Sequence, residues 1–385
     1  MMRLAFYAPM ESPDHQFPSV DGKIARKLIK VLRLGGNIVS IASHFQSYND
    51  TGQSDRLESI RIAGKCHANN IIEEIKNLSV NKAPEVWITY KISPKSPDWI
   101  GPLVASALNI PYIIIEALYS NKYRSSPWAS NLNATAQAIA QADVIVSFTQ
   151  QNIDSLISLK SGKSINFLLP PFLDFSNYET CIKNRIGTRR KLAEKYSLSL
   201  SKPWLVAISP MHPGHTLASY RILGRSLWLI DKPNFHLLTI GGGKALPLVK
   251  ESLGPLGKGL VAWLGNQQEQ NIPNLLSACD ICVWPAYKET FSISLLECQA
   301  AGLPVIAGGF GAVPEIIQNG ETGMVISPWN DIEFAEAIVK LSRDASSRKK
   351  MGLQAQRMIK EKYSLSTAEI ILNQALSEAK KIYKL

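Results

Sequence analysis

The sequence has few cysteines, no long apolar run and no basic cluster interleaved with aromatic residues. Its five cysteines are scattered, odd in number and placed in a chain of 385 residues, so a disulfide framework is excluded. No run approaches the roughly 20 apolar residues of a membrane-spanning helix. The opening MMRLAFYAPM turns to proline and charge too early for a secretory signal. We therefore expect a cytoplasmic protein.

The formal net charge of +11 favours anionic partners such as nucleotides, phosphorylated substrates or an acidic membrane face. Lysine and arginine are spread along predicted helices rather than gathered with aromatic residues, so we do not expect nucleic acid as a partner. A solvated basic surface remains the alternative interpretation of this charge.

Short apolar runs alternate with segments of helical periodicity along the whole chain. Several of these runs are apolar on both sides, as in a parallel sheet that helices cover on both faces. Because single cores rarely grow past about 250–300 residues, we predict an α/β protein with two Rossmann-like, doubly wound domains. The predicted strands are RLAFYAP, NIVSIAS, EVWITY, PYIIIEA and DVIVSF, followed by PWLVAIS, FHLLTIGGG, VAWLG, DICVWPA, LPVIAGG and TGMVIS.

The alternation pauses near Pro170-Pro171, which can neither continue a central strand nor enter a helix interior. We predict an N-terminal domain over 1–170, a linker over 171–200 and a second domain over 201–365. Residues 366–385 form a predicted amphipathic helix, with Ser366 and Glu369 as a capping box. Packing on its own chain is favoured over lying on a membrane.

Two glutamates follow the predicted strand DICVWPA. Glu289 lies just past the strand, where α/β sheets bind ligands. The segment SISLLECQAAG then predicts a helix whose first free amides, on Phe291, Ser292 and Ile293, can hold a phosphate. Glu297 lies about one turn inside and can accept hydrogen bonds from sugar hydroxyls. Alternatively, Ser294 and Glu297 form a capping box, and Glu289 is an ordinary loop carboxylate.

The segment WPAYKETFSISLLECQAAGLPVIAGGFGAVPEIIQNGETGMVI resembles the signature of retaining glycosyltransferases of family 4, among the glycosyl transferases group 1. That signature has a proline at a strand end, a glutamate, seven residues, a second glutamate, and a small-residue stretch ending in Gly-x-Pro-Val. The resemblance implies the GT-B fold, in which two Rossmann-like domains face a cleft and a C-terminal helix returns to the N-terminal domain.

The same resemblance implies the chemistry. A nucleoside-diphosphate sugar would be held by the C-terminal domain, with Glu297 on the ribose and Glu289 on the transferred sugar. The acceptor, a glycan, a lipid-linked compound or a small molecule, would enter from the N-terminal domain. The family works without a metal or other cofactor, and this chain lacks the D-x-D pair by which other glycosyltransferases hold a divalent ion.

Two glycine-containing loops of the second domain are candidates for donor binding. Where many relatives carry an arginine and a lysine that clamp the diphosphate, this chain has His212 and Thr216, around a turn at Gly214. An imidazole and a hydroxyl can still donate hydrogen bonds, although surface loop residues are the alternative. In GGGK, Gly242 lets a nucleotide approach the backbone, or forms part of a tight turn.

The first domain offers candidate acceptor residues. Where relatives place a histidine, the strand end IIIEALY has Glu116, which can bind an acceptor hydroxyl or act as a general base. The alternative is a structural carboxylate paired with a lysine or arginine. In the proline-stiffened loop after the first strand, Asp14, His15 and Asp21 are the expected acceptor contacts. Asp21 can instead cap the following helix.

These patterns together predict retaining glycosyl transfer, with polysaccharide biosynthesis as the expected setting and peripheral contact with the inner membrane face permitted by the basic surface. Two alternatives stay open. A nucleotide-sugar epimerase of the same architecture would act without an acceptor, and an inactive descendant would bind a nucleotide as a partner protein. The substitutions at His212 and Thr216 favour the second alternative.

Overall fold

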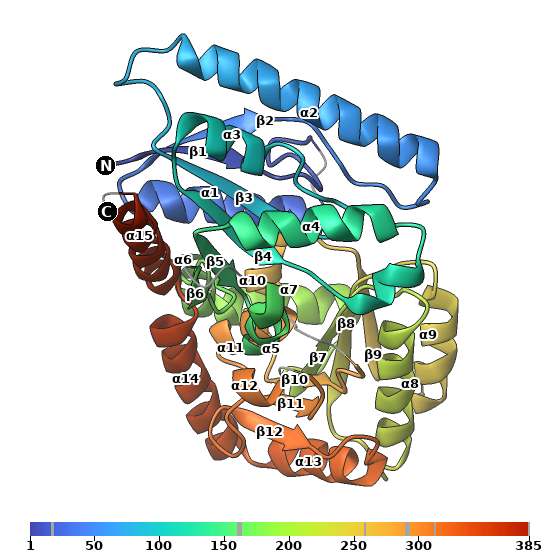
Figure 1. Cartoon of the computed structure of the whole chain (residues 1–385). Coiled ribbons are helices and arrows are strands. Elements are labelled where there is room, and N and C mark those ends of the chain that lie inside the picture. The colour runs from blue at the N-terminus through green and yellow to red at the C-terminus, as the bar shows by residue number, and fades with distance from the viewer. Residues whose placement is uncertain (17–18, 160–163, 258, 289–292, 312, 384–385) are drawn as a thin grey trace. The chain divides into compact units, whose positions relative to one another are not determined.

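The computed structural model describes residues 1–16, 19–159, 164–257, 259–288, 293–311 and 313–383 (Figure 1). The chain forms two compact units, Met1–Pro171 with Leu365–Leu385, and Phe172–Ser364. Each unit is built on one six-stranded parallel sheet. Within the described part of the chain, no helix is both long and apolar enough to cross a membrane.

The sheet of the first unit has the order β2-β1-β3-β4-β5-β6. Its central strands are buried on both faces, as the apolar runs predict. Five of its strands were predicted, whereas β6 was not, because its side chains alternate between half-buried and exposed at the sheet edge. The strands are β1 (Arg3–Tyr7), β2 (Ile38–Ser43), β3 (Val86–Ile92), β4 (Tyr112–Ala117), β5 (Val144–Ser147) and β6 (Ile165–Leu168).

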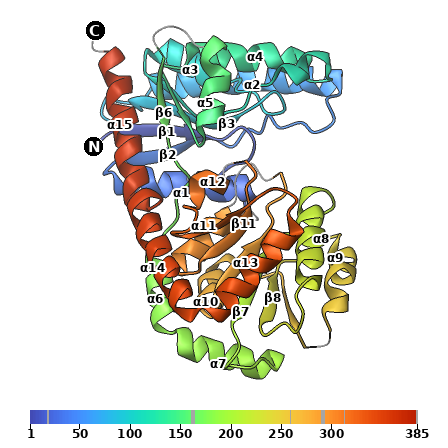
Figure 2. The same cartoon turned by 90° about the horizontal axis from the view of Figure 1, so that it is seen from below.

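Helices cover both faces of this sheet. Figure 2 shows α2, α3 and α4 on one face and α1 on the other, where α1 contacts α15. Short 3-10 turns, η1 (Asn121–Ser125) and η2 (Ile157–Leu159), follow β4 and α5. The helices are α1 (Val20–Leu34), α2 (Ser54–Lys76), α3 (Gly101–Leu108), α4 (Ala129–Gln141), α5 (Gln150–Leu156) and α15 (Leu365–Ile382).

The C-terminal helix α15 packs on the first unit, which confirms the predicted return of the chain. Leu372, Leu376 and Ala379 are buried there. Lys380 Nζ donates to Glu85 Oε1 over 2.6 Å. Ile370, which the periodicity also predicts to be buried, is 57% exposed. The apolar face of α15 is therefore covered by its own chain, as the sequence analysis favours over a membrane-bound helix.

The sheet of the second unit has the order β12-β11-β10-β7-β8-β9, and all six strands were predicted. They are β7 (Trp204–Ile208), β8 (His236–Ile240), β9 (Val261–Gly265), β10 (Ile281–Trp284), β11 (Val305–Gly308) and β12 (Gly323–Ile326). The helices are α6 (Ser176–Lys183), α7 (Arg185–Tyr196), α8 (His215–Trp228), α9 (Leu246–Leu253), α10 (Ile272–Ser277), α11 (Ile293–Ala300), α12 (Val313–Ile316), α13 (Asp331–Arg343) and α14 (Ala345–Lys362). Two 3-10 turns, η3 (Gly254–Leu256) and η4 (Glu269–Asn271), precede β9 and α10.

Residues 172–200, which the sequence analysis treats as a linker, instead form α6 and α7 within the second unit. Three donors converge on the Asp280 carboxylate: Arg185 at 2.6 Å, Arg189 at 2.9 Å and the Trp204 amide at 2.7 Å. The Arg189 guanidinium also lies 4.0 Å from the centre of the Trp204 ring. These contacts fix the segment to the sheet, although its sequence is too polar to show a buried face.

Both sheets change winding direction at a defined point. In the first unit the strand order reverses between β1 and β3, and in the second between β7 and β10. Ligands of open α/β sheets bind outside the carboxyl ends of the strands at such switch points. The loops after these four strands are therefore where each unit is expected to bind its ligand.

Candidate functional site

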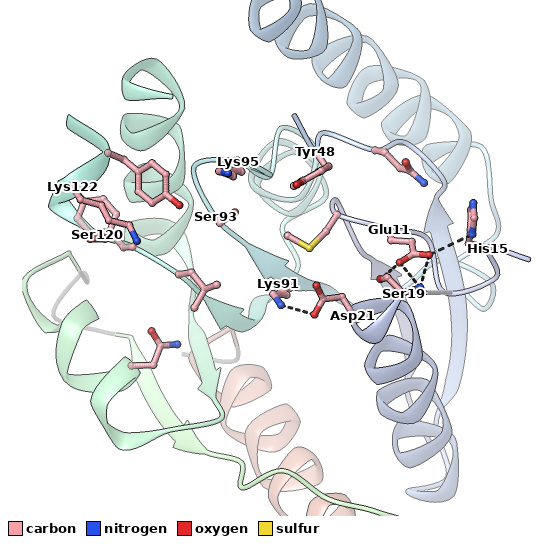
Figure 3. Close-up of a pocket in the computed structure, with 16 residues that line it drawn as sticks. Glu11, His15, Ser19, Asp21, Tyr48, Lys91, Ser93, Lys95, Ser120 and Lys122 are labelled. Carbon is pink, nitrogen blue, oxygen red and sulfur yellow. Dashed lines mark hydrogen bonds and ion pairs between the residues drawn. The ribbon is translucent and has the colours of Figure 1, made fainter. Parts of the chain in front are cut away.

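The first unit has a pocket of about 890 Å³ at its switch point (Figure 3). It is lined by side chains from the loop after β1 and the start of α1, from the end of β3 and the loop after it, and from the segment that follows β4. Figure 3 shows Ser120 and Lys122 on one side and Glu11, His15 and Ser19 on the other. The pocket is therefore lined mainly by polar and charged side chains from loops that follow parallel strands.

An ion pair lies between the two sides of this pocket. Lys91 Nζ donates to Asp21 Oδ1 over 2.5 Å, and each side chain is 22% exposed. The capping interpretation of Asp21 is wrong, because Ser19 is the N-cap of α1 and its side chain accepts from the Gly22 amide. The Asp21 carboxylate is thus held at the pocket by a cation.

Glu116 lies near the end of β4, beside the pocket. The Phe148 amide donates to Glu116 Oε2 over 2.9 Å. Burial raises the pKa of the Glu116 carboxyl, while this hydrogen bond and the nearby Lys91 charge act in the opposite direction. The backbone of Glu116 has φ of 65°, a conformation that costs free energy for a non-glycine residue and often occurs at functional sites.

Of the two remaining predicted acceptor residues, one lies at the pocket and the other does not. His15 lines the pocket, and its Nδ1 lies 3.4 Å from Glu11 Oε1. Asp14 does not line it and instead accepts from the Ser12 hydroxyl at 2.5 Å, which lowers the pKa of Asp14. Its Oδ1 also lies 3.2 Å from His44 Nδ1. The prediction thus places two of its three loop residues at the pocket.

Sequence reasoning missed the lysines of this pocket, Lys91, Lys95 and Lys122. Lys91 lies near the end of β3, and Lys95 lies in the loop that follows it. Knowing that β3 pairs with β1 at the switch point would have singled out that loop, but strand order is not visible in the sequence.

In the second unit, glycines bring the loops after β7 and β8 together. The Met211 amide donates to the Gly242 carbonyl oxygen over 2.9 Å. Gly241 has φ of 136°, and a Cβ atom there would lie 2.0 Å from the Ser209 carbonyl oxygen. A side chain at Gly243 would lie 2.4 Å from the Met211 carbonyl oxygen. The backbone itself therefore forms this edge of the sheet, with no room for side chains at two of the three glycines.

The predicted donor residues after β7 are exposed or half-buried. Gly214 precedes α8 with φ of 96°, and His212 is exposed. Thr216 Oγ1 donates to the His212 carbonyl oxygen over 2.9 Å. In this conformation the Thr216 hydroxyl proton is committed, so the side chain is left as an acceptor rather than the predicted donor.

Helix α11 begins at Ile293 and places Glu297 about one turn inside, as predicted. Ser294 lies within the described helix rather than at its N-cap, which argues against the capping-box interpretation. Glu297 instead bonds to the hydroxyl of Tyr178 on α6, and burial together with Glu297 raises the Tyr178 pKa. Tyr178 is only 4% exposed. The predicted residues Glu289, Phe291 and Ser292 lie outside the described residues.

An aromatic cluster that sequence reasoning missed follows β10, β11 and β12. The Tyr287 ring centre lies 5.5 Å from both His215 and Phe310, and 4.5 Å from Trp329. The Tyr287 amide donates to Ser219 Oγ over 2.9 Å, which fixes the loop to α8. Trp329 is 58% exposed and has φ of 66°. The second switch point therefore combines glycine backbone with aromatic rings.

Two Rossmann-like units, each with a ligand edge at its switch point, define the GT-B class of folds, and comparison with solved structures confirms this. A glycosyltransferase from Rickettsia africae aligns over 100% of this chain and 99% of its own, with a TM-score of 0.73 and 18% identity. The Anabaena protein Alr3699/HepE, in complex with UDP and glucose, covers 98% of this chain and 100% of its own, with a TM-score of 0.68 and 15% identity.

Residues 218–358, which lie within the second unit, match the family model of glycosyl transferases group 1. N-acetyl-α-D-glucosaminyl L-malate synthase of Bacillus anthracis is 24% identical over 56% of this chain and 56% of its own. D-inositol 3-phosphate glycosyltransferase of Nocardia farcinica is 25% identical over 70% of this chain and 60% of its own. The chain thus spans little more than half the length of these curated relatives.

Proposed function

We propose that the protein is a retaining glycosyltransferase of family 4, which moves a sugar from a nucleoside-diphosphate sugar to an acceptor. The observation that carries the proposal is Glu297 on α11, which is half-buried beside Tyr178 of α6 and lies inside the segment that matches the family model. The spacing of Glu289 and Glu297 in the sequence supports it.

In this proposal the donor binds the second unit. Glu297 accepts hydrogen bonds from the ribose hydroxyls, and Glu289 contacts the transferred sugar. The first amides of α11, on Phe291, Ser292 and Ile293, stabilise the departing diphosphate by the partial positive charge of a helix N-terminus. The loops at His212, Gly214 and Gly242 approach the nucleotide through the backbone, which is compatible with the absence of the usual arginine and lysine.

The acceptor binds the pocket of the first unit in this proposal, with Asp21 and His15 as contacts and Glu116 oriented toward the reacting hydroxyl. Retention follows if the leaving phosphate oxygen takes the acceptor proton on the face where the new bond forms. The protein then contributes positioning and stabilisation of charge. No metal is required, so activity should survive EDTA. We place the reaction in the cytoplasm, with any membrane contact made by surface charge.

The test combines binding and turnover. The full chain is screened by thermal shift against a panel of nucleotide sugars, and the best donor is then incubated with candidate acceptors. A bound ligand raises Tm by mass action, and NMR of the product reports the anomeric configuration. An inverted product would overturn retention, and absence of any nucleotide-sugar binding would overturn the whole proposal.

Variants separate the remaining alternatives. Glu289→Gln and Glu297→Gln should each reduce turnover at least about 100-fold, as expected when an interaction of the transition state is lost. Glu321→Gln, an exposed carboxylate of the same unit, is the matched control. Free epimer formed from the donor without acceptor would favour the epimerase. Donor binding without turnover on any acceptor would favour the inactive partner protein.

A further inference from the structure

Two lysines in the pocket of the first unit rest on one pair of aromatic rings. Lys95 Nζ lies 4.5 Å from the centre of the Trp128 ring, and Lys122 Nζ lies 5.4 Å from that of Tyr123. The two rings meet edge to face, with centres 6.2 Å apart. One pair of aromatic rings in mutual contact therefore carries both ammonium groups.

The loop that carries Lys95 is fixed in place by hydrogen bonds. The Asn49 amide donates to the Lys95 carbonyl oxygen over 2.9 Å, and Asn131 Nδ2 donates to the Pro94 carbonyl oxygen over 3.0 Å. The Trp128 indole donates to the Asn49 carbonyl oxygen over 2.9 Å. Asn49 therefore ties the backbone of Lys95 to the ring on which its ammonium lies, so the charge is preorganised rather than carried on a free surface side chain.

The charges of the pocket do not balance. Lys91 is paired with Asp21, and the Glu11 carboxylate accepts from the Ser19 amide at 3.0 Å and faces His15. Among the residues that the structure describes, no carboxylate forms an ion pair with Lys95 or Lys122. The pocket therefore contains two lysines, Lys95 and Lys122, that no described carboxylate neutralises (Figure 3).

The surrounding groups indicate which anion fits. Ser120, Tyr119 and Tyr123 also line the pocket and add hydroxyl groups that can donate hydrogen bonds. Planar carboxylates are matched by the two-pronged arginine side chain, whereas lysines act as point charges and suit the several oxygens of a phosphate group. Two lysines with hydroxyl donors thus favour a phosphate over a carboxylate.

We propose that the acceptor is a phosphate monoester whose phosphate binds Lys95 and Lys122. Its hydroxyl to be glycosylated then lies toward Asp21, on the far side of the same pocket. That the bound phosphate compound is an acceptor rests on the proposed function. The anion site itself can be tested without any donor or turnover.

The experiment measures binding of three related probes to the full chain by ligand-observed NMR: glycerol 3-phosphate, glycerate and glycerol. We expect glycerol 3-phosphate to bind at least about 10-fold more tightly than the other two. Lys95→Gln and Lys122→Gln should each weaken its binding about 10-fold, and the double variant should abolish it. Lys82→Gln removes an exposed lysine of the same unit and should change binding less than two-fold.

Several results would overturn the inference. Equal binding of glycerate would show that the site takes carboxylates, and an unchanged affinity in the double variant would show that the lysines are not the site. If Lys95→Gln does not fold, the affinity of Lys122→Gln for glycerol 3-phosphate is the test, because Lys122 is exposed and its replacement should not disturb folding. Nucleotide-sugar binding is measured on the same samples. If the wild-type chain binds glycerol 3-phosphate but no nucleotide sugar, the proposed function is wrong and the anion site stands. If it binds a nucleotide sugar but not glycerol 3-phosphate, only the anion site is wrong.

Discussion

The two sheets have the same architecture, yet their switch points present different chemistry. In the first unit, charged side chains gather where β1 and β3 end, with the Lys91–Asp21 ion pair beside the half-buried Glu116. In the second unit, the loops after β7 and β8 meet through glycine backbone, and an aromatic cluster around Tyr287 follows β10. One edge therefore presents charged side chains to a ligand, and the other presents backbone and ring surfaces.

This difference explains how the second unit could serve the proposed function without the arginine and lysine that many relatives carry. Where backbone amides hold a diphosphate, replacement of an arginine and a lysine by His212 and Thr216 removes contacts without removing the site. The proposed ligand contacts of the first unit are individual side chains, so the loss of one is not compensated by the backbone. The comparison predicts that adding a Cβ atom harms the second edge most and that neutralising a charge harms the first.

The largest effect is expected from Gly241→Ala. Its Cβ atom would lie 2.0 Å from the Ser209 carbonyl oxygen in a backbone conformation with φ of 136°. We expect a loss of about 3 kcal/mol or more in the free energy of unfolding and at least a 100-fold loss in nucleotide-sugar affinity. Urea denaturation and calorimetric titration measure the two.

Gly320→Ala is the control for backbone conformation alone, since Gly320 has φ of 80° and no atom within 4 Å of its Cβ position. It should cost only about 1–2 kcal/mol and leave donor affinity unchanged. Equal losses in the two variants would mean that backbone strain, and not the close approach of the two loops, determines the effect.

Glu116→Gln should separate activity from stability. If Glu116 orients the acceptor hydroxyl, turnover falls about 100-fold. Because burial raises its pKa, the native state holds the proton more tightly than the unfolded chain, and stability declines as pH rises between the ordinary and the raised pKa. Glutamine removes that cost and still accepts the hydrogen bond from Phe148.

The Tm of Glu116→Gln should therefore exceed that of the wild type at pH 7.5, and the difference should shrink as pH falls toward 4. Thermal melts at several pH values measure it. A variant that is less stable at pH 7.5 would instead identify Glu116 as the structural carboxylate that the sequence analysis leaves open.

The sequence predicts more of the fold than of the candidate site. Apolar runs flanked by glycine and proline identify nearly all strands, because buried parallel strands need such runs. The edge strand β6 has too weak a pattern, and α7 buries only Leu192 and Ala193, so residues 172–200 do not look like part of a core.

Site residues could be predicted only where a motif or a strand end marks them. Glu297 and Glu116 are marked in that way, whereas Lys95 and its ring Trp128 meet only through tertiary structure. The bond between Tyr178 and Glu297 joins the predicted linker 171–200 to a segment more than 100 residues further along the chain. A contact of this kind needs the packing of α6 against the sheet, which no local pattern contains.

Tyr178→Phe tests that contact with a smaller expected effect. The substitution keeps the buried ring and removes only the hydroxyl that bonds to Glu297. Losing a hydrogen bond to a charged group costs about 1.5–3 kcal/mol, so donor affinity should fall about 10-fold or more while kcat at saturating donor stays within about three-fold. Calorimetric titration and steady-state kinetics measure both.

Tyr196→Phe, an aromatic of the same segment that contacts the core, is the matched control. The contrary outcome is also informative. A Tyr178→Phe variant that binds the donor as tightly as the wild type would show that Glu297 is positioned by α11 alone. The second edge would then rely on backbone even more strongly than the comparison states.

The smallest effect is expected at Trp329. Its ring packs on Tyr287 at 4.5 Å and on Phe310 at 5.9 Å, but more than half of the side chain is exposed. Trp329→Ala should cost about 1 kcal/mol of stability from lost ring contacts. Trp329→Gly should recover part of this loss, because glycine adopts a φ of 66° without the Cβ penalty. If backbone amides hold the donor, both variants should bind nucleotide sugars within about three-fold of the wild type by calorimetric titration. A loss of 10-fold or more in both would mean that the aromatic cluster stacks on the ligand, and the second edge would then depend on side chains as much as the first.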